Sequence, residues 1–240
     1  MPTVTETVRE IALNHPSSIR VFEQFGIDYC CGGRKPLAIA CTEQDVEIGT
    51  VLAALAEAAS ESSPALTDWS KASLENLAGH IVSQHHEYVK KELPRLDTLA
   101  KKVVAAHGSH HLELPEIQSA LQALDQELTQ HLMKEEQILF PYIALLESAL
   151  ATGSARPHSC FGTVANPIAM MMQEHDGAGE LLAEIRQLSG NFTTPEDACP
   201  TYHAFYEGLR EFERDLHQHI HLENNILFPR AIEMEASSSR

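Results

Sequence analysis

Apolar residues recur every three or four positions along most of the chain, which predicts helices rather than strands. Two long stripes show this spacing: Ile117, Leu121, Leu124 and Leu128, and Phe205, Leu209, Phe212 and Leu216. Near the N-terminus a shorter pattern surrounds a break at His15-Pro16, with Val8, Ile11 and Ala12 on one side and Ile19, Phe22 and Phe25 on the other. We therefore expect an all-α protein.

The pattern divides into two predicted domains. Residues 1–58 are expected to form a small helical module, with a glycine-rich turn at Cys31-Gly32-Gly33 and a helix from about Thr42 to Ala58. Residues 59–68 are small and polar and contain Pro64, so we expect a linker there. Residues 69–240 form the second predicted domain.

This second domain contains an internal repeat. The segment from His131 to Pro141 matches that from His219 to Pro229 at an offset of 88 positions, and a weaker match joins Val82–Leu96 to Met171–Ile185 at an offset of 89. Two similar helical hairpins predict an up-down four-helix bundle with pseudo-two-fold symmetry, the halves being joined by the connection around residues 152–167. The two Ile-Leu-Phe-Pro endings are expected to pack in the core and then stop each helix at its proline.

The repeat carries chemistry on its apolar face. His131 and Glu135, like His219 and Glu223, stand four residues apart, so each pair shares one face of a helix. The other two helices each contribute one predicted inward histidine, His86 and His175. A single such His/Glu pair is usually a surface pair. Two copies on apolar stripes, however, indicate that four histidines and two glutamates hold a pair of metal ions, because buried unpaired carboxylates are costly.

Some alternatives remain open around these ligands. His85 competes with His86, because Ile81, His85 and Val89 also fit an apolar stripe, although the repeat alignment favours His86. His217 and His221 fall off the inward stripe and are expected at the surface or just behind the ligands. Imidazole and carboxylate ligands without thiolate suit iron or manganese, and zinc less exclusively.

The composition restricts the expected partners and cellular compartment of the protein. The chain has 34 acidic and 17 basic residues, a formal charge of −17, which argues against nucleic acid or an anionic membrane as a partner. No basic segment followed by an apolar run opens the sequence, and no apolar stretch is long enough to span a membrane. Five irregularly spaced cysteines suit a reducing cytoplasm better than a disulfide framework.

The N-terminal module has one sharp motif, Asp28-Tyr29-Cys30-Cys31-Gly32-Gly33. The glycines allow a tight turn that would expose the two thiols, and a nearby helix N-terminus would lower a thiol pKa. Cys30 and Cys31 are therefore candidate catalytic residues for thiol or metal transfer. A turn with incidental cysteines is an equally good interpretation of the motif alone.

Taken together, these motifs resemble the iron–sulfur cluster repair proteins, also called repair of iron centres proteins, of the YtfE, ScdA and DnrN type. The resemblance spans nearly the whole chain: the double-cysteine motif, the segments 131–141 and 219–229, and the third-helix motif 174–181. It implies a hemerythrin-like bundle holding two iron ions with an oxo or hydroxo bridge. Glu135 and Glu223 would bridge the ions, and His86, His131, His175 and His219 would be terminal ligands. The connection 156–166 is longer than the family pattern.

The resemblance also implies a function. The expected role is repair of iron–sulfur clusters damaged by nitric oxide or oxidative stress, by donation of iron to the damaged iron–sulfur proteins. An alternative is a cytoplasmic di-iron protein that binds or reduces nitric oxide, with nitric oxide or dioxygen as its small ligand. A repair or binding protein is favoured over a classical enzyme. Nitric oxide reductase activity is the one enzymatic function that stays open.

Overall fold

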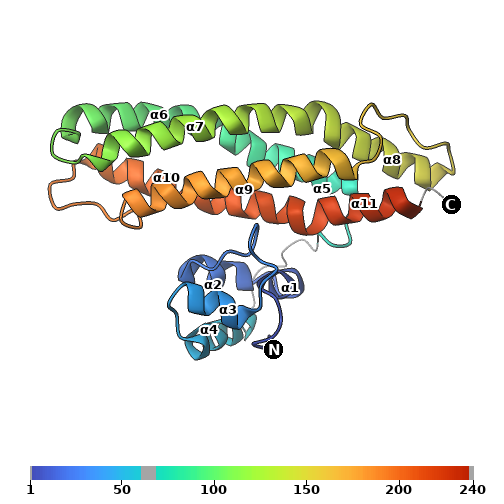
Figure 1. Cartoon of the computed structure of the whole chain (residues 1–240), viewed down its shortest axis with the longest axis horizontal. Helices are drawn as coiled ribbons and strands as arrows, with labels where there is room; N and C mark the ends of the chain where they lie inside the picture. Colours follow the sequence, from blue (N-terminus) through green and yellow to red (C-terminus); the bar gives the residue numbers. More distant parts are fainter. Residues whose placement is uncertain (1, 61–68, 238–240) are drawn as a thin grey trace. The chain divides into compact units, whose positions relative to one another are not determined.

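The computed structural model describes residues 2–60 and 69–237, and helices account for most of them (Figure 1). Within this described part the only β-type pairing is an isolated bridge between Thr7 and Pro36. The expected all-α class is thus confirmed. Of the predicted linker, residues 61–68 lie outside the described residues.

The contacts divide the chain into two compact units. One comprises Met1–Ala72 with Ile220–Pro229, and the other comprises Ser73–His219 with Arg230–Arg240.

The first unit contains four helices: α1 (Val8–Asn14), α2 (Ser18–Phe25), α3 (Leu37–Glu43) and α4 (Ile48–Ser60). Thr7 begins α1 with a capping box, because its side chain accepts from the Glu10 N–H while the Glu10 carboxylate accepts from the Thr7 N–H. Gly26 ends α2 in the left-handed conformation that glycine adopts most easily. The predicted apolar cluster is confirmed as this unit's core: Val8, Ile11, Ala12 and Phe22 are buried, and Ile19 and Phe25 pack against them.

The predicted helix from Thr42 to Ala58 is wrong in its first part. The structure ends α3 at Glu43 and begins α4 only at Ile48. Asp45 between them has φ of 53°, outside helical space, and the Glu47 carboxylate accepts from the N–H groups of Gly49 and Thr50. A polar residue that caps a helix from its side chain therefore starts a new helix where the apolar spacing alone indicated a continuous one.

The remaining helices form four long runs within residues 69–237 (Figure 1). The first run is α5 (Leu74–Ile81), η1 (Val82–His86) and α6 (Glu87–His107), and the second is α7 (Glu113–Lys134), η2 (Glu135–Leu139) and α8 (Phe140–Thr152). The third run is α9 (Ala165–Leu188), and the fourth is α10 (Pro200–Leu222), η3 (Glu223–Leu227) and α11 (Phe228–Ser237). Helix α7 packs against both α6 and α9, and α5 packs against α8. These runs form the expected four-helix bundle.

Three of the four runs contain a single π-helical turn. Each turn closes with a backbone hydrogen bond five residues back, from Glu87 to Val82, from Phe140 to Glu135, and from Phe228 to Glu223. Such turns are rare and occur mostly at functional sites.

The π-turns also correct the prediction that Pro141 and Pro229 stop their helices. Each proline instead lies in the first turn of the next α-helix, α8 or α11. The missing proline N–H is tolerated there, because a first-turn N–H has no partner within its own α-helix and the preceding hydrogen-bond ladder has slipped by one residue.

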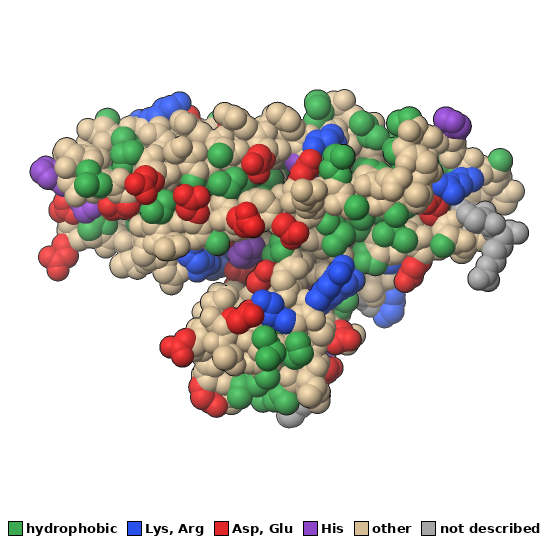
Figure 2. Space-filling model, viewed as in Figure 1, with side chains coloured by type: hydrophobic (Ala, Val, Ile, Leu, Met, Phe, Trp, Pro, Cys, Tyr) green, Lys and Arg blue, Asp and Glu red, His purple; other side chains and the backbone are tan. Residues whose placement is uncertain are grey.

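The predicted apolar stripes form the bundle core. All eight residues of the two long stripes are buried, from Ile117 to Leu128 and from Phe205 to Leu216. Acidic side chains are spread over the face drawn in Figure 2, as expected from the charge of −17. Within residues 2–60 and 69–237, no helix combines the length and apolar character needed to cross a membrane.

The connection between α8 and α9 is held by a side chain from α11. Glu235 is buried, and its carboxylate accepts hydrogen bonds from the Tyr142 hydroxyl (2.9 Å) and the Val164 N–H (3.0 Å) and pairs with Arg156. Val164 directly precedes α9, so the carboxylate also lies where the positive end of that helix dipole stabilises a negative charge.

Candidate metal centre

Six polar side chains meet in the bundle interior, and the repeat explains where each one comes from. His86 ends η1, His131 lies in the last turn of α7, and His175 and His219 lie on α9 and α10, while Glu135 and Glu223 each begin a π-turn. None is more than 2% exposed. The structure thus brings together all six ligands that the sequence predicted.

The six residues fall into two overlapping groups. One is His86, Glu135, His219 and Glu223, and the other is His131, Glu135, His175 and Glu223. Within each group one ligand atom per residue lies within 4.8 Å of the others. Both glutamates belong to both groups, so the arrangement has two cation positions that share two carboxylates.

The nitrogen positions fit metal coordination. His86 Nε2 lies 3.1 Å from His219 Nε2, and His131 Nε2 lies 3.0 Å from His175 Nε2. Two imidazole nitrogens bound at right angles to one ion, each at about 2.1 Å, would be about 3 Å apart. Two neutral imidazoles can form only one hydrogen bond to each other, whereas a cation satisfies both lone pairs.

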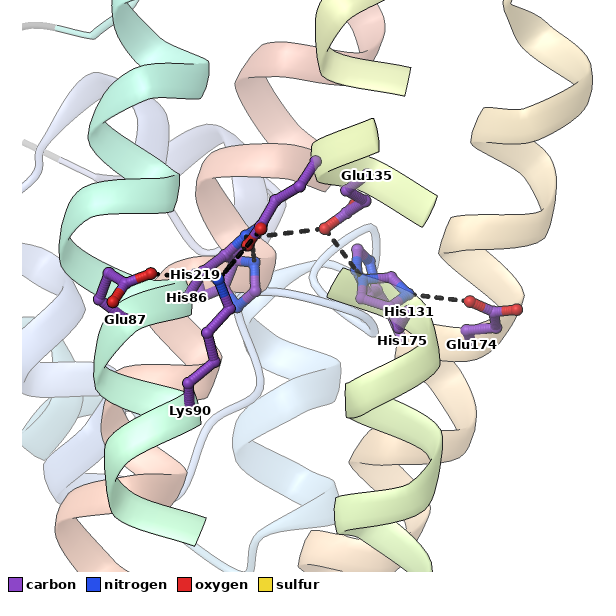
Figure 3. A network of polar contacts seen from close by, with 9 residues as sticks. His86, Glu87, Lys90, His131, Glu135, Glu174, His175 and His219 are labelled. Carbon is purple, nitrogen blue, oxygen red and sulfur yellow. Dashed lines mark hydrogen bonds and ion pairs between the residues drawn. The ribbon is translucent and has the colours of Figure 1, made fainter. Parts of the chain in front are cut away.

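Glu135 lies between the two groups. Its Oε2 is 3.4 Å from His86 Nε2 in one group and 3.3 Å from His131 Nε2 in the other (Figure 3). One carboxylate oxygen is therefore close to imidazole nitrogens of both groups. Carboxylate and imidazole together are suitable ligands for iron, manganese or zinc.

The outer nitrogens of two ligands are held by carboxylates that the sequence analysis did not assign. His86 Nδ1 contacts Glu136 Oε1 at 2.8 Å, and His131 Nδ1 contacts Glu174 Oε2 at 2.9 Å. Each glutamate also pairs with a lysine, Lys90 for Glu136 and Lys134 for Glu174. These carboxylates accept a hydrogen bond from Nδ1–H. The ring proton is therefore on Nδ1, and the Nε2 lone pair faces the interior.

The same contacts set the charge of the two outer glutamates. Partial burial raises the pKa of Glu136, but hydrogen bonds from Lys90 and His86 outweigh it, and the net pKa is below the usual value. Lys134 and His131 have the same effect on the pKa of Glu174. Both groups are therefore carboxylates at neutral pH. Glu136 also lines two surface hollows of about 260 and 430 Å³.

The neighbouring histidines have different roles. His85 is buried but belongs to neither group, and its Nδ1 contacts Asp215 Oδ1 at 3.0 Å. The structure therefore favours His86 over His85 as a ligand. His221, expected at the surface or just behind the ligands, is 3% exposed. Burial lowers its pKa to about 4, and its Nδ1 contacts the Asn225 amide at 2.9 Å.

The double-cysteine motif forms a tight turn around Asp28. The Asp28 carboxylate accepts from the N–H groups of Cys30 (2.9 Å), Cys31 (3.0 Å) and Gly32 (2.7 Å). A Cβ on Gly32 would lie 2.8 Å from Asp28 Oδ2, and one on Gly33 would lie 2.8 Å from the Tyr29 carbonyl oxygen. The close backbone approach thus requires glycine at position 33, whereas a side chain at position 32 would displace the Asp28 carboxylate. In the same unit, the Asn225 amide donates to that Tyr29 carbonyl at 3.0 Å.

The two thiols are close together but are not equally exposed. Their sulfurs are 3.8 Å apart, and Cys30 is only 6% exposed while Cys31 is half-buried. The hydrogen bond to Cys31 and burial raise the pKa of Cys30 well above the usual value. Cys30 is therefore a neutral thiol near pH 7, and the expectation that the turn exposes both thiols is wrong for Cys30. None of the five cysteines forms a disulfide, and all five lie within the described residues.

Sequence reasoning missed the residues that support the ligands. Glu136 and Glu174 each stand next to a predicted ligand in the chain, at Glu135 and His175, and that adjacency was the available signal. Their reach to histidines on other helices depends on helix packing and on the π-turns, which leave no clear sequence pattern.

Comparison with known proteins agrees with this geometry. Residues 77–231 match the model of the hemerythrin HHE cation binding domain, and residues 4–59 match a domain of unknown function, DUF542. The iron–sulfur cluster repair protein YtfE of Salmonella choleraesuis (strain SC-B67) is 41% identical over 223 residues, covering 93% of this chain and 94% of that protein. The proteins of the same name from Salmonella paratyphi B (strain ATCC BAA-1250 / SPB7) and Salmonella newport (strain SL254) are 40% identical over the same shares. With a cation-binding bundle over more than half of its length and this identity over nearly all of it, the chain belongs to the YtfE-type iron–sulfur cluster repair proteins of the hemerythrin HHE family.

Proposed function

We propose that this protein holds two iron ions and repairs iron–sulfur clusters damaged by nitric oxide or oxidative stress by donating iron to the damaged proteins. The observation that carries the proposal is the pair of overlapping His₂Glu₂ groups with shared, fully buried carboxylates. The relatives named for cluster repair support the choice of function. Five free cysteines are consistent with action in a reducing cytoplasm.

The proposed ligands are His86 and His219 for one iron, His131 and His175 for the other, and Glu135 and Glu223 for both. Iron with an oxo or hydroxo bridge would supply a redox-active, exchangeable cation pair. The chain's own part is to exclude water, to present four Nε2 lone pairs inward, and to supply two negative charges that offset those of the cations. Two divalent cations bring four positive charges, of which the two carboxylates neutralise two and an oxo or hydroxo bridge would neutralise two or one more.

Cys30 and Cys31 are proposed to assist in transfer. Their sulfurs, 3.8 Å apart, can bind one soft cation together, and metal binding would deprotonate the Cys30 thiol whose pKa is otherwise raised. This assigns the pair a role in metal handling rather than in nucleophilic attack.

The test is anaerobic reactivation. The iron-loaded protein is mixed with a hydratase whose iron–sulfur cluster has been damaged by nitric oxide, and recovery of hydratase activity is followed. We expect recovery with the parent protein, little with Glu135→Leu, and a reduced rate with Cys30→Ala/Cys31→Ala. Free ferrous iron at the same concentration is the control, and recovery that is no faster than with this control would contradict donation.

A second candidate function is binding or reduction of nitric oxide. Each group offers four protein residues, two of which are shared carboxylates, so a six-coordinate iron would retain room for a diatomic ligand. When nitric oxide is added to the same anaerobic mixture with the diferrous protein as reductant, accumulation of nitrous oxide without recovery of the hydratase would support reduction. Stoichiometric nitrosylation of the iron, with neither nitrous oxide formation nor recovery of hydratase activity, would support a binding role.

A further inference from the structure

Two of the proposed ligand histidines are held at their outer nitrogens by carboxylates. A carboxylate–lysine pair on the bundle surface holds His86 through Glu136 and Lys90. A second pair holds His131 through Glu174 and Lys134, and Figure 3 shows the contact between His131 and Glu174. The glutamates are only partly exposed, 26% and 30% of their side chains. Each is therefore close enough to solvent to retain its lysine and buried enough to hold the imidazole firmly.

These pairs are distributed one to each cation position. His86 belongs to the group with His219, and His131 belongs to the group with His175. Each position thus has one histidine whose Nδ1 is anchored by a glutamate that is itself held by a lysine.

The internal repeat shows that this distribution does not follow from duplication. At the offset of 88, Glu136 corresponds to Asn224 and Lys134 corresponds to Leu222. At the offset of 89, Lys90 corresponds to Gly179, and Glu174 corresponds to His85. The ligands themselves repeat, but neither member of either carboxylate–lysine pair does. The pairs are therefore a feature of particular helices, placed so that each cation position receives one.

An anchoring carboxylate changes what its histidine can do. It fixes the Nδ1–H tautomer, restricts rotation of the ring and makes Nε2 more basic, and loss of such a partner typically weakens metal binding about 10- to 100-fold. A lysine that pairs with the carboxylate limits its movement.

We propose that Glu136 and Glu174 are positioning residues that set, independently of each other, how tightly each of the two irons is held. Glu136 acts on the iron that His86 and His219 would bind. Glu174 acts on the iron that His131 and His175 would bind. This inference rests on the proposed function, in which the irons must be released, and it identifies the side chains that control that release.

The experiment measures iron release from the full-length, iron-loaded protein into an excess of a coloured ferrous chelator under anaerobic conditions. Glu136→Gln and Glu174→Gln keep the shape and the acceptor oxygen but remove the charge. We expect each variant to release one of its two irons about 10- to 100-fold faster than the parent and the other at the parental rate. The double variant should release both irons quickly.

Glu87→Gln is the matched control. Glu87 pairs with the same Lys90, at 3.1 Å, and is 64% exposed, so the substitution removes a charge from the same surface without touching a histidine. We expect parental release rates for it. Lys90→Met, which leaves Glu136 in place but unpaired from its lysine, should give an intermediate acceleration of the same iron.

A second readout separates positioning from a general loss of structure. In the diamagnetic zinc-loaded protein, ¹⁵N spectra should show the Nδ1 proton signal of His86 shifted in Glu136→Gln while that of His131 stays unchanged, and the reverse in Glu174→Gln. Parental release rates in both glutamine variants, or equal acceleration of both irons in each single variant, would overturn the proposal. No damaged cluster takes part, so failure of repair leaves this result intact.

Discussion

At the scale of single residues, the centre is defined by Glu135, a carboxylate with no exposure to solvent. One of its oxygens lies within 3.4 Å of imidazole nitrogens from both cation positions. A carboxylate in this place costs the metal-free protein stability, because a charge is removed from water, and it is offset when cations are bound. We therefore expect this residue to lower the stability of the metal-free chain and to raise its affinity for metal.

We expect Glu135→Leu to change both metal binding and the stability of the metal-free protein. Iron loading should yield no spin-coupled di-iron signal in Mössbauer spectra, and the metal-free variant should be as stable as the parent, or more stable by up to about 4 kcal/mol in urea unfolding. Glu223→Leu is expected to behave in the same way. A retained coupled signal in either variant would contradict the bridging assignment.

The cysteines make a second prediction at this scale. A hydrogen bond from His107, followed by the N–H groups of Tyr202 and Thr201, lowers the pKa of Cys199, whereas burial raises that of Cys41. As the pH rises from 6, Cys199 should become a thiolate first, so it should react with iodoacetamide at a lower pH than Cys41.

Mass spectrometry of alkylated peptides across a pH series provides the measurement. In His107→Ala the reaction of Cys199 should shift to higher pH, because the largest cause of the lowered pKa is removed. Identical pH profiles for Cys199 in parent and variant would contradict this role of His107.

At the scale of elements, the π-turns set the positions of the ligands. Glu135 and Glu223 each begin such a turn and His86 ends one, so the extra residue in each turn lies directly beside a ligand.

Deleting Gln137, an exposed residue of η2, should therefore test the turn itself. The turn would become α-helical, and because a π-turn accommodates one extra residue, α8 would keep the orientation in which Tyr142, Ile143 and Leu146 are buried. We expect the helical content in circular dichroism to stay parental while the iron content of the loaded protein falls, because the backbone directly beside Glu135 changes. Gln137→Ala, the control, should leave both quantities unchanged, and parental iron content in the deletion variant would contradict this role of the turn.

The π-turns and the helix ends also show how far sequence reasoning reaches. Periodicity and the internal repeat were sufficient to predict the bundle and the burial of all six proposed ligands, because both depend on spacing along one helix. The stop at Pro141 and the helix from Thr42 were wrong, because a π-turn and a cap by Glu47 arise from local hydrogen bonds that apolar spacing does not record. The contact of Glu174 with His131 depends on the packing of α9 against α7, which no single-helix pattern contains.

At the scale of the whole molecule, the net negative charge and the binding of metal cations would both affect the stability of the folded protein. The chain carries a formal charge of −17, and four imidazoles and two carboxylates are buried at its centre. Ligand binding to the native state alone adds RT ln(1 + [L]/Kd), which is about 2.7 kcal/mol at a hundredfold excess over Kd.

Removal of iron should therefore lower the thermal midpoint. For a domain of this size each kcal/mol shifts the midpoint by roughly 2 to 4 °C, so we expect a decrease of roughly 5 to 11 °C for each of the two irons removed, by calorimetry after anaerobic chelation. Readdition of ferrous iron should restore the midpoint in the parent and leave that of Glu135→Leu unchanged. An unchanged midpoint in the chelated parent would indicate that the buried groups are stabilised without a metal.

The role of Glu235 has a consequence for biosynthesis. Its carboxylate secures the connection that precedes α9, yet it belongs to α11, near the end of the chain. During synthesis the residues that Glu235 holds, Val164 at the start of α9 and Tyr142 in α8, are made well before Glu235 itself. These contacts can therefore form only after α11 has been added to the growing chain.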